Sequence, residues 1–254
     1  MSGSTEREKR REQRLHEETE VERVTRRKRL TQLVSGAMFL AIVAVAVAIV
    51  VSQSQSSGGN TNLEDVGLVQ KQLNGIPQEG AVLGYPKAKV TLIEFGDLQC
   101  PVCKAYSEQV IPQLISGPVK SGKARIDFHN YTIIGPQSTP AGAAALAAGE
   151  QGRGWNYIEL FYRNQGPEDS GYATDSFLKA IAKGAGVKNL AKWNADRRSK
   201  RILKQVSNTT GEAERLGFTG TPSFAVLGPG TKGIETLETP GSAGALEEAI
   251  EKAG

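Results

Sequence analysis

The two cysteines of this chain lie three positions apart, in the segment Cys100-Pro101-Val102-Cys103. The β-branched stretch before them is typical of a buried strand, and apolar residues at a spacing of four after them are typical of a helix. The pair is therefore expected at a helix N-terminus, where unpaired N–H groups and the helix dipole favour a thiolate. Two sulfurs one turn apart can close a disulfide and reopen it, so the pattern predicts thiol–disulfide exchange.

The order of the two cysteines predicts different roles for them. Cys100 should sit at the helix N-cap with an exposed sulfur and a pKa below the ordinary value of about 8.5. Cys103, one turn into the helix, should be more buried and have a higher pKa. The mixed disulfide with a substrate is then expected at Cys100. Cys103 would attack that bond when a substrate is reduced, whereas the substrate's own second thiol would do so when it is oxidised.

A metal site and a structural disulfide are the other interpretations of this segment. Structural zinc needs four ligands, usually Cys and His, and the part of the chain expected to fold supplies Cys100, Cys103 and His129. The set is one short, so neither a metal nor another cofactor is predicted. A disulfide framework would need more cysteines at wider spacing. A single CxxC disulfide without turnover remains open.

The basic charge of the chain lies in its N-terminal tail. The sequence has 31 Lys and Arg against 27 Asp and Glu, and residues 1–32 hold ten of the basic and seven of the acidic residues. Residues 52–254 are therefore close to neutral. A nucleic-acid-binding protein would carry its positive charge on the folded domain, so nucleic acid is not an expected partner.

The segment from residue 33 to residue 51 is apolar and contains no charged residue. As a helix it would span about 28 Å, close to the hydrocarbon thickness of a membrane. It is predicted to be a single transmembrane helix. A cleaved signal peptide is the alternative, but the charged region before it is long and the apolar run exceeds the usual length. Four basic residues end at Arg29 and the next is Lys71, so the N-terminus is expected in the cytoplasm and the rest outside.

The remaining sequence predicts an α/β domain. The expected parts are a charged cytoplasmic tail over 1–32, the membrane helix over 33–51, a linker over 52–75 and a folded domain over 76–254. Within that domain the residue patterns predict strands at 89–95, 124–134, 223–227 and 234–237. They also predict a helix from 100 to about 116 with a kink at Pro112, helices at 141–148, 155–162, 175–183 and about 187–216, and a helix at 242–252. This order, with a helical block inserted at about 139–216, is that of a thioredoxin-like fold.

Several segments resemble the DsbA-like disulfide oxidoreductases, in their membrane-anchored bacterial branch. They are Gly75-Ile76-Pro77-Gln78, Leu83-Gly84, residues 89–95 and 97–103, residues 143–151, Trp155, residues 161–165 and Gly220-Thr221-Pro222-Ser223-Phe224. The resemblance covers roughly residues 70–252. It implies a thioredoxin fold with an inserted helical domain. It also implies that Pro222 is a cis-proline facing the cysteines, that Thr221 binds substrate backbone, and that a membrane quinone-linked enzyme reoxidises the pair.

Four other features have both a functional and a structural interpretation. Glu94 lies in an apolar strand six residues before Cys100 and could relay a proton for Cys103, an acid that the family shares; the alternative is a solvent-facing side chain on an edge strand. Asp97 could influence the thiolate or organise the loop. Trp155 and Trp193 are expected in the core of the helical insertion, and His129 is expected to be a packed or surface residue rather than a catalytic one. The basic run at 197–201 is expected to be a solvated helix face.

The predicted function is thiol–disulfide exchange with protein or peptide substrates outside the cytoplasm, in the direction of introducing disulfides. Strongly oxidising members of the family often carry His between the cysteines, whereas this chain has Pro101-Val102, which puts the direction in doubt. The alternatives are a reductase or isomerase fed with electrons from the cytoplasm, and a non-catalytic membrane-tethered module that binds peptides or assembles envelope proteins.

Overall fold

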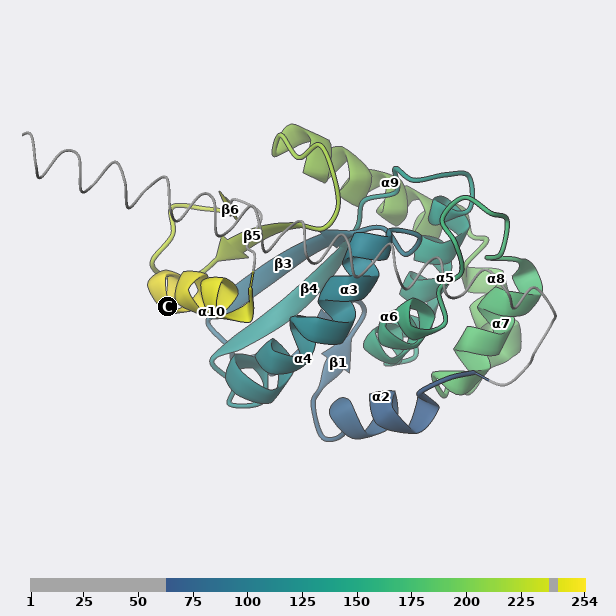
Figure 1. The fold of residues 1–254 in the computed structure, drawn as a ribbon, viewed down its shortest axis with the longest axis horizontal. Helices are drawn as coiled ribbons and strands as arrows, with labels where there is room; N and C mark the ends of the chain where they lie inside the picture. Colours follow the sequence, from purple (N-terminus) through teal and green to yellow (C-terminus); the bar gives the residue numbers. More distant parts are fainter. Residues whose placement is uncertain (1–62, 238–241) are drawn as a thin grey trace, which may run out of the picture. The chain divides into compact units, whose positions relative to one another are not determined.

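The computed structural model describes residues 63–237 and 242–254. Within these residues, six strands form one sheet, in the order β1-β2-β4-β3-β5-β6 (Figure 1). Their bounds are Gln78–Glu79, Val82–Leu83, Val90–Gly96 (β3), Ala124–Asn130 (β4), Ser223–Leu227 (β5) and Glu235–Leu237 (β6). The two central strands, β3 and β4, run parallel, and the other neighbours pair antiparallel.

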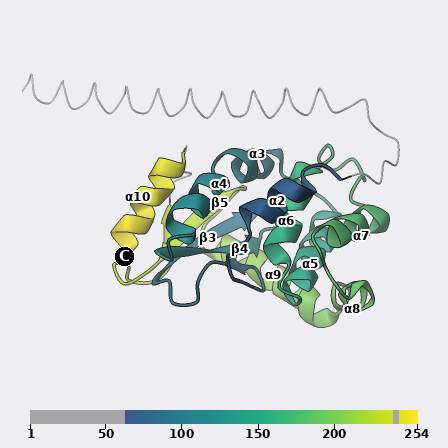
Figure 2. The same cartoon turned by 90° about the horizontal axis from the view of Figure 1, so that it is seen from below.

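Helices cover both faces of the sheet, as Figure 2 shows for α3 and α4 on one side and α9 on the other. The described helices are α2 (Val66–Gln72), α3 (Pro101–Gln109), α4 (Ile111–Leu114), the π-helical turn η1 (Ile115–Val119), α5 (Ser138–Gly149), α6 (Gly154–Arg163), α7 (Asp175–Gly184), α8 (Leu190–Asp196), α9 (Lys200–Arg215) and α10 (Ala243–Ala253). Helices α5 to α9 lie between β4 and β5 in the chain. The fold is therefore thioredoxin-like with a helical insertion.

Side-chain alternation along β3 assigns its residues to the two faces of the sheet. Val90 and Leu92 belong to the main core with α3, α6 and α10, whereas Ile93 and Phe95 pack in a second cluster with Ala213 of α9. Because successive side chains in a strand point to opposite faces, Glu94 shares the face of Leu92 and points toward α3. Glu94 is therefore buried beneath the cysteine-bearing helix, because β3 is a central strand and the side chain of Glu94 points to the face that α3 covers.

The helical insertion packs against the thioredoxin-like part through aromatic side chains. Trp155 and Trp193 are buried, as expected, and their indole nitrogens donate to the backbone carbonyls of Ala81 and Ala144. Phe128 of β4 contacts the rings of Trp155 and Tyr162 edge-on. These contacts join α6 to the central sheet and fix the position of α6 beside α3.

The structure differs from the sequence expectations at several element boundaries. The helix expected from 100 to about 116 breaks at Val110, and Pro112 lies in the first turn of α4, where its missing N–H is no loss. The strand expected to reach 134 ends at Asn130, after which the chain turns toward Asp97. The helix expected over 187–216 is two helices, because the Ser199 hydroxyl accepts from Ile202 N and starts α9.

The short elements before β3 were not expected. Residues 66–72, inside the stretch predicted to be a linker, form α2, which packs against α6 through Val69 and buries Leu73. A helix of seven residues, about two turns, is too short for a clear periodicity signal. The transmembrane helix predicted at 33–51 lies outside the described residues. Among the residues that are described, no helix is long and apolar enough to cross a membrane.

Candidate active site

The cysteine pair lies just after the C-terminal end of β3, at the start of α3. Cys100 is the N-cap residue of α3, with extended backbone, and its sulfur accepts from Cys103 N at 3.3 Å. Asp97 organises the preceding turn: its carbonyl accepts from Cys100 N, and its carboxylate oxygens accept from Gln99 N and from the backbone N–H groups of residues 133 and 134. The contacts of Asp97 thus match the loop-organising interpretation.

Both sulfurs belong to free thiols and both residues are buried, Cys100 with 3% of its surface exposed and Cys103 with none. The expectation of an exposed sulfur at Cys100 is therefore wrong. The reason is a loop from far along the chain, because the Cys100 thiol donates to the carbonyl of Thr221 at 3.3 Å. A local pattern around the cysteines could not show this cover.

The two thiols are shifted in opposite directions, as their order predicted. A hydrogen bond from the Cys103 thiol lowers the pKa of Cys100, and the backbone N–H groups of Cys103 and Val102 add to this against the opposing effect of burial. The Thr221 hydroxyl, which is buried without a hydrogen-bond partner among the described residues, lies near enough to contribute. Burial raises the pKa of Cys103 well above its ordinary value, and the charges of Cys100 and Glu94 raise it further.

The peptide bond between Thr221 and Pro222 is cis, as the family resemblance implied. The bond lies directly before β5, which pairs with β3 from Phe95↔Ser223 onward. This pairing carries Thr221 to the end of β3 and so to the sulfur of Cys100. The structure therefore brings together Cys100, Cys103, Thr221 and Pro222 from segments about 120 residues apart.

Glu94 is buried beneath the pair, with 2% of its surface exposed, on a central strand rather than an edge strand. Burial raises its pKa to about 8, and the charges of Glu159 and Cys100 raise it as well. Its charge in turn raises the pKa of Cys103. The interpretation of Glu94 as a solvent-facing edge residue is thus excluded, and the carboxyl lies within electrostatic range of both thiols.

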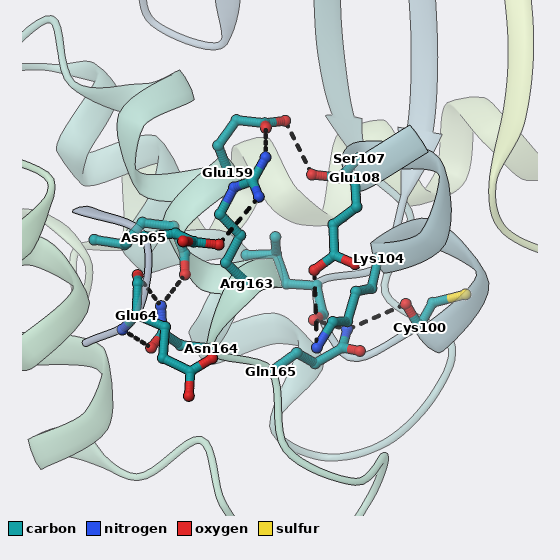
Figure 3. A network of polar contacts seen from close by, with 12 residues as sticks. Glu64, Asp65, Cys100, Lys104, Ser107, Glu108, Glu159, Arg163, Asn164 and Gln165 are labelled. Carbon is teal, nitrogen blue, oxygen red and sulfur yellow. Dashed lines mark hydrogen bonds and ion pairs between the residues drawn. The ribbon is translucent and has the colours of Figure 1, made fainter. Parts of the chain in front are cut away.

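Two residues of α6 and its C-terminal end hold the cysteine turn in place. Gln165 Nε2 donates to the carbonyls of Leu98 at 2.7 Å and Cys100 at 3.1 Å (Figure 3). Tyr162 OH donates to the Asp97 carbonyl at 3.2 Å. Both residues fall in the 161–165 segment of the family resemblance, but no sequence pattern indicates where their side chains point.

The last residue of β3, Gly96, packs closely against Phe128. A Cβ at Gly96 would lie 2.7 Å from the Phe128 ring, so only glycine allows the strand to approach the ring this closely.

His129 is not part of the thiol site. Its ring contacts the Phe95 ring edge-on, on the α9 side of the sheet, and its nitrogens lie 2.9 Å from a Glu212 carboxylate oxygen and 3.2 Å from an Asp127 one. The expectation of a packed or surface residue fits these contacts. Within the described part of the chain, no group of three or more His, Cys, Asp or Glu side chains is arranged to hold a metal ion.

The basic run at 197–201 is only partly a solvated face. The Arg197 side chain is buried, lies over the Trp193 ring at 5.1 Å and bonds Asp175 and Asn194. The expectation is wrong for this residue because the chain turns between α8 and α9, which directs Arg197 back onto the insertion. Arg198 and Arg201 remain exposed, as expected.

A cysteine pair at a helix N-terminus, faced by a cis-proline loop in this fold, defines a thioredoxin-type thiol–disulfide site. Residues 77–251 match the family model described as Thioredoxin. The chain is 32% identical over 149 residues to the probable disulfide bond formation protein D of Bacillus cereus, covering 58% of this chain and 69% of that protein. It is 27% identical over 164 residues to disulfide bond formation protein D of Bacillus subtilis, covering 62% and 70%.

Solved structures show the same fold. The oxidised form of BdbD from Bacillus subtilis superposes with a TM-score of 0.61 at 20% identity, covering 70% of this chain and 97% of that one. The chain therefore belongs to the DsbA-like thioredoxin family of thiol–disulfide oxidoreductases.

Proposed function

We propose that this chain introduces disulfides into other proteins outside the cytoplasm. Cys100 exchanges with the substrate, and Cys103 closes the chain's own disulfide. The observation that carries the proposal is the opposite shift of the two thiols, with the pKa of Cys100 lowered and that of Cys103 raised. A stabilised Cys100 thiolate favours the reduced form of the pair, which makes the disulfide form an oxidant.

The exchange runs in two steps that follow from this asymmetry. A substrate thiolate attacks the sulfur of Cys100 in the Cys100–Cys103 disulfide, and Cys103 leaves and takes up a proton. A second substrate thiolate then attacks the substrate sulfur of the mixed disulfide, and Cys100 leaves as the favoured thiolate. The substrate's two thiols are oxidised and the disulfide of the pair is reduced. Glu94 is the acid placed to exchange the proton with Cys103.

Substrate backbone is proposed to bind at Thr221 and Pro222. The Thr221 carbonyl is already within 3.3 Å of the Cys100 sulfur, so an extended peptide paired there would hold its own sulfur near Cys100. In the reduced form the Cys100 thiol donates its hydrogen bond to the Thr221 carbonyl. When Cys100 ionises, it can no longer donate, and the carbonyl is free to accept from a substrate.

The site is proposed to face the outside of the cell membrane, anchored by a helix at 33–51 with the N-terminus in the cytoplasm. Support comes from the uncharged run and its one-sided basic flank. Disulfides persist in that compartment. A quinone-linked membrane enzyme would reoxidise the pair. Protease added to intact spheroplasts should digest residues beyond about 60 and spare a tag at Met1; protection of the C-terminal domain would overturn this orientation.

Cysteine variants test the exchange itself. Cys103→Ser should accumulate covalent complexes with substrate proteins on non-reducing gels, and Cys100→Ser should not. Alkylation of the reduced chain at pH 6 should label Cys100 first. Equal trapping by both variants would contradict the assigned roles. Blank results in insulin reduction and dithiol oxidation would indicate a non-catalytic binding module instead.

The reduction potential tests the direction. Equilibration with glutathione should give a value well above roughly −200 mV for an oxidant, whereas a value near −270 mV would indicate a thioredoxin-like reductant. The latter result would remove the oxidase assignment and leave the exchange chemistry in place.

A further inference from the structure

Glu159 is a buried carboxyl group of α6 that the exchange steps above leave unused. Only 1% of its surface is exposed. Ser107 Oγ donates to its Oε1 at 3.0 Å, and Gln72 Nε2 donates to its Oε2 at 3.3 Å. The nearest Arg163 nitrogen lies 3.9 Å from Oε2. A carboxylate inside the fold, held by two neutral donors and one more distant cation, is costly to keep ionised.

Glu159 lies along the same buried helix face as the thiol site. Ser107 follows Cys103 by one turn of α3 and both are buried, so they stack on one face of the helix. Glu94, which points to this face from β3, interacts electrostatically with Cys103 and with Glu159. Glu94 is therefore within electrostatic range of both Cys103 and Glu159.

From Glu159, polar contacts continue to the surface. Gln72 of α2 accepts from Arg163 Nη2 at 3.4 Å, and Arg163 Nη1 pairs with Asp65 at 3.3 Å. The Asp65 side chain is about half exposed. Figure 3 shows Glu159 between Ser107 and Arg163, with its carboxylate directed to both. Polar contacts thus connect Glu159 to solvent-exposed groups on one side, and on the other Glu159 lies within electrostatic range of the acid beneath the thiols.

We propose that Glu159 exchanges a proton with Glu94 and so connects the buried Cys103 to solvent at the α2–α6 surface. This rests on the proposed function, because it concerns the proton that Cys103 must release and take up. Glu159 touches no sulfur, so it is a positioning residue that acts through Glu94.

The proton balance is clearest in the reoxidation half of the cycle. Cys100 is then joined to a sulfur of the disulfide-bearing partner. Cys103 gives its proton to the Glu94 carboxylate, its thiolate attacks the Cys100 sulfur, and the partner's sulfur leaves as a thiolate. Glu94 passes the proton to the Glu159 carboxylate, from which it reaches solvent. The two thiols of this chain are oxidised and the partner's disulfide is reduced; substrate oxidation runs the proton inward.

The surroundings of the two carboxyl groups give them similar pKa values. Burial raises the pKa of Glu94 to about 8, with Glu159 and Cys100 adding to it. Burial also raises the pKa of Glu159 to about 7, opposed by Arg163 and by the hydrogen bonds of Ser107 and Gln72. The remaining charged groups facing Glu159 are Glu108 of α3, paired with Lys104, and beyond Arg163 the carboxylate of Asp65. Proton transfer between two such acids near neutral pH has little uphill cost.

The test is the pH dependence of disulfide closure in the full chain, held in detergent. The reduced protein is mixed with a saturating excess of oxidised glutathione and quenched in acid, and formation of the Cys100–Cys103 disulfide is followed by mass. Glu159→Gln should close three- to tenfold more slowly than the wild type between about pH 7 and 8, where the wild-type Glu159 carboxyl is ionised in part and can accept a proton. The two rates should converge by about pH 9.5, where hydroxide removes the proton from Cys103 directly. Glu159→Asp, which keeps an acid, should lie between them.

The matched control is Glu150→Gln, which removes an exposed carboxylate of the same insertion that pairs with Arg201; its profile should follow the wild type. Equal rates for Glu159→Gln and wild type at all pH values would overturn the proposal. So would slowing by one factor at every pH, which a purely structural role predicts. If the glutamine variant does not fold, Glu159→Asp must still be slower at neutral pH and converge at pH 9.5.

An infrared titration of buried carboxyl groups gives a second readout. Glu159→Gln should remove one protonated carboxyl band and move the Glu94 midpoint to lower pH, because the charge of Glu159 is gone; an unmoved midpoint would contradict the electrostatic interaction between the two carboxyls. Neither measurement depends on whether the chain is an oxidase. A low reduction potential would therefore reject the proposed direction and leave this relay standing.

Discussion

Two regions of this domain bury ionisable side chains in contrasting ways. Beneath the thiols, Glu94 and Glu159 are buried within electrostatic range of each other, and the nearest cation beside Glu159, Arg163, lies 3.9 Å from its carboxylate. In the insertion, Arg197 meets Asp175, and behind the sheet His129 meets Asp127 and Glu212. Opposite charges in contact stabilise each other's ionised form, whereas neighbouring carboxyls resist ionisation. The second arrangement is suited to holding structure, and the first to moving a proton near neutral pH.

The largest expected effect is on stability at alkaline pH. The pKa of Glu94 is raised in the folded state, so the folded chain binds more protons than the unfolded one above about pH 4.5. The contribution of Glu94 to the free energy of unfolding is therefore fully present below about pH 4.5, and it is lost as the pH rises through the folded-state pKa of about 8. Glu94→Gln should remove this loss and raise the free energy of unfolding at pH 8 by about 3–4 kcal/mol.

Urea unfolding across pH 5–9, with the dithiol kept reduced, measures this profile. Glu248→Gln, which removes an exposed carboxylate paired with Lys252, should leave the wild-type profile unchanged. Parallel profiles for Glu94→Gln and wild type would show that Glu94 is ionised in the fold, and the contrast between the two regions would be lost.

Gln165→Ala should have the next largest effect. It leaves the buried carbonyls of Leu98 and Cys100 without their amide donor, which costs about 1–3 kcal/mol, and it loosens the turn that presents Cys100. Exchange should slow as well as stability fall. Gln151→Ala is the matched control, since the Gln151 amide donates to the carbonyl of Asn189 and accepts from its N–H, away from the cysteine turn and closer to solvent. A stability loss with unchanged exchange kinetics would limit Gln165 to a structural role.

Arg197→Met should lower the free energy of unfolding and leave the rate of thiol–disulfide exchange unchanged. The substitution keeps an apolar stem over Trp193 but loses the cation and the bonds to Asp175 and Asn194. Asp175 is exposed, so screening limits the cost to about 1–2 kcal/mol. Arg198→Met, which removes an exposed partner of the same carboxylate, should change stability by less than about 0.5 kcal/mol. Equal losses for the two variants would show that burial of Arg197 contributes nothing.

The smallest effect is expected at His129. Burial lowers its pKa, but Asp127 and Glu212 outweigh this and the net pKa is raised. A raised His pKa gives stability that is full below the unfolded value of about 6.5 and is lost as pH rises through the folded value. His129→Gln should flatten the unfolding profile there by less than about 1 kcal/mol. A change in exchange rate would place His129 in the site, contrary to its position behind the sheet.

Local sequence patterns predict those parts of the fold that depend on near neighbours in the chain. The strand before Cys100, the helix after it and the helices around Trp155 and Trp193 all carry long apolar patterns. They fail where a capping side chain or a short segment decides the structure. Ser199 splits one expected helix into two, and α2 occupies part of the predicted linker because it finds a partner in α6.

The thiol pair and its asymmetry follow from local sequence, because a spacing of three residues at a helix N-terminus sets the positions of the sulfurs and of the N–H groups that face them. The groups that surround the pair depend on the folded chain as a whole. Thr221, which is 121 residues from Cys100 in the chain, covers its sulfur. Gln165, which is 65 residues away, donates to the Cys100 carbonyl, and Ser107 donates to Glu159 across a separation of 52 residues. These partners depend on which faces of β3, α3 and α6 pack together, and that is a property of the assembled core rather than of any local pattern.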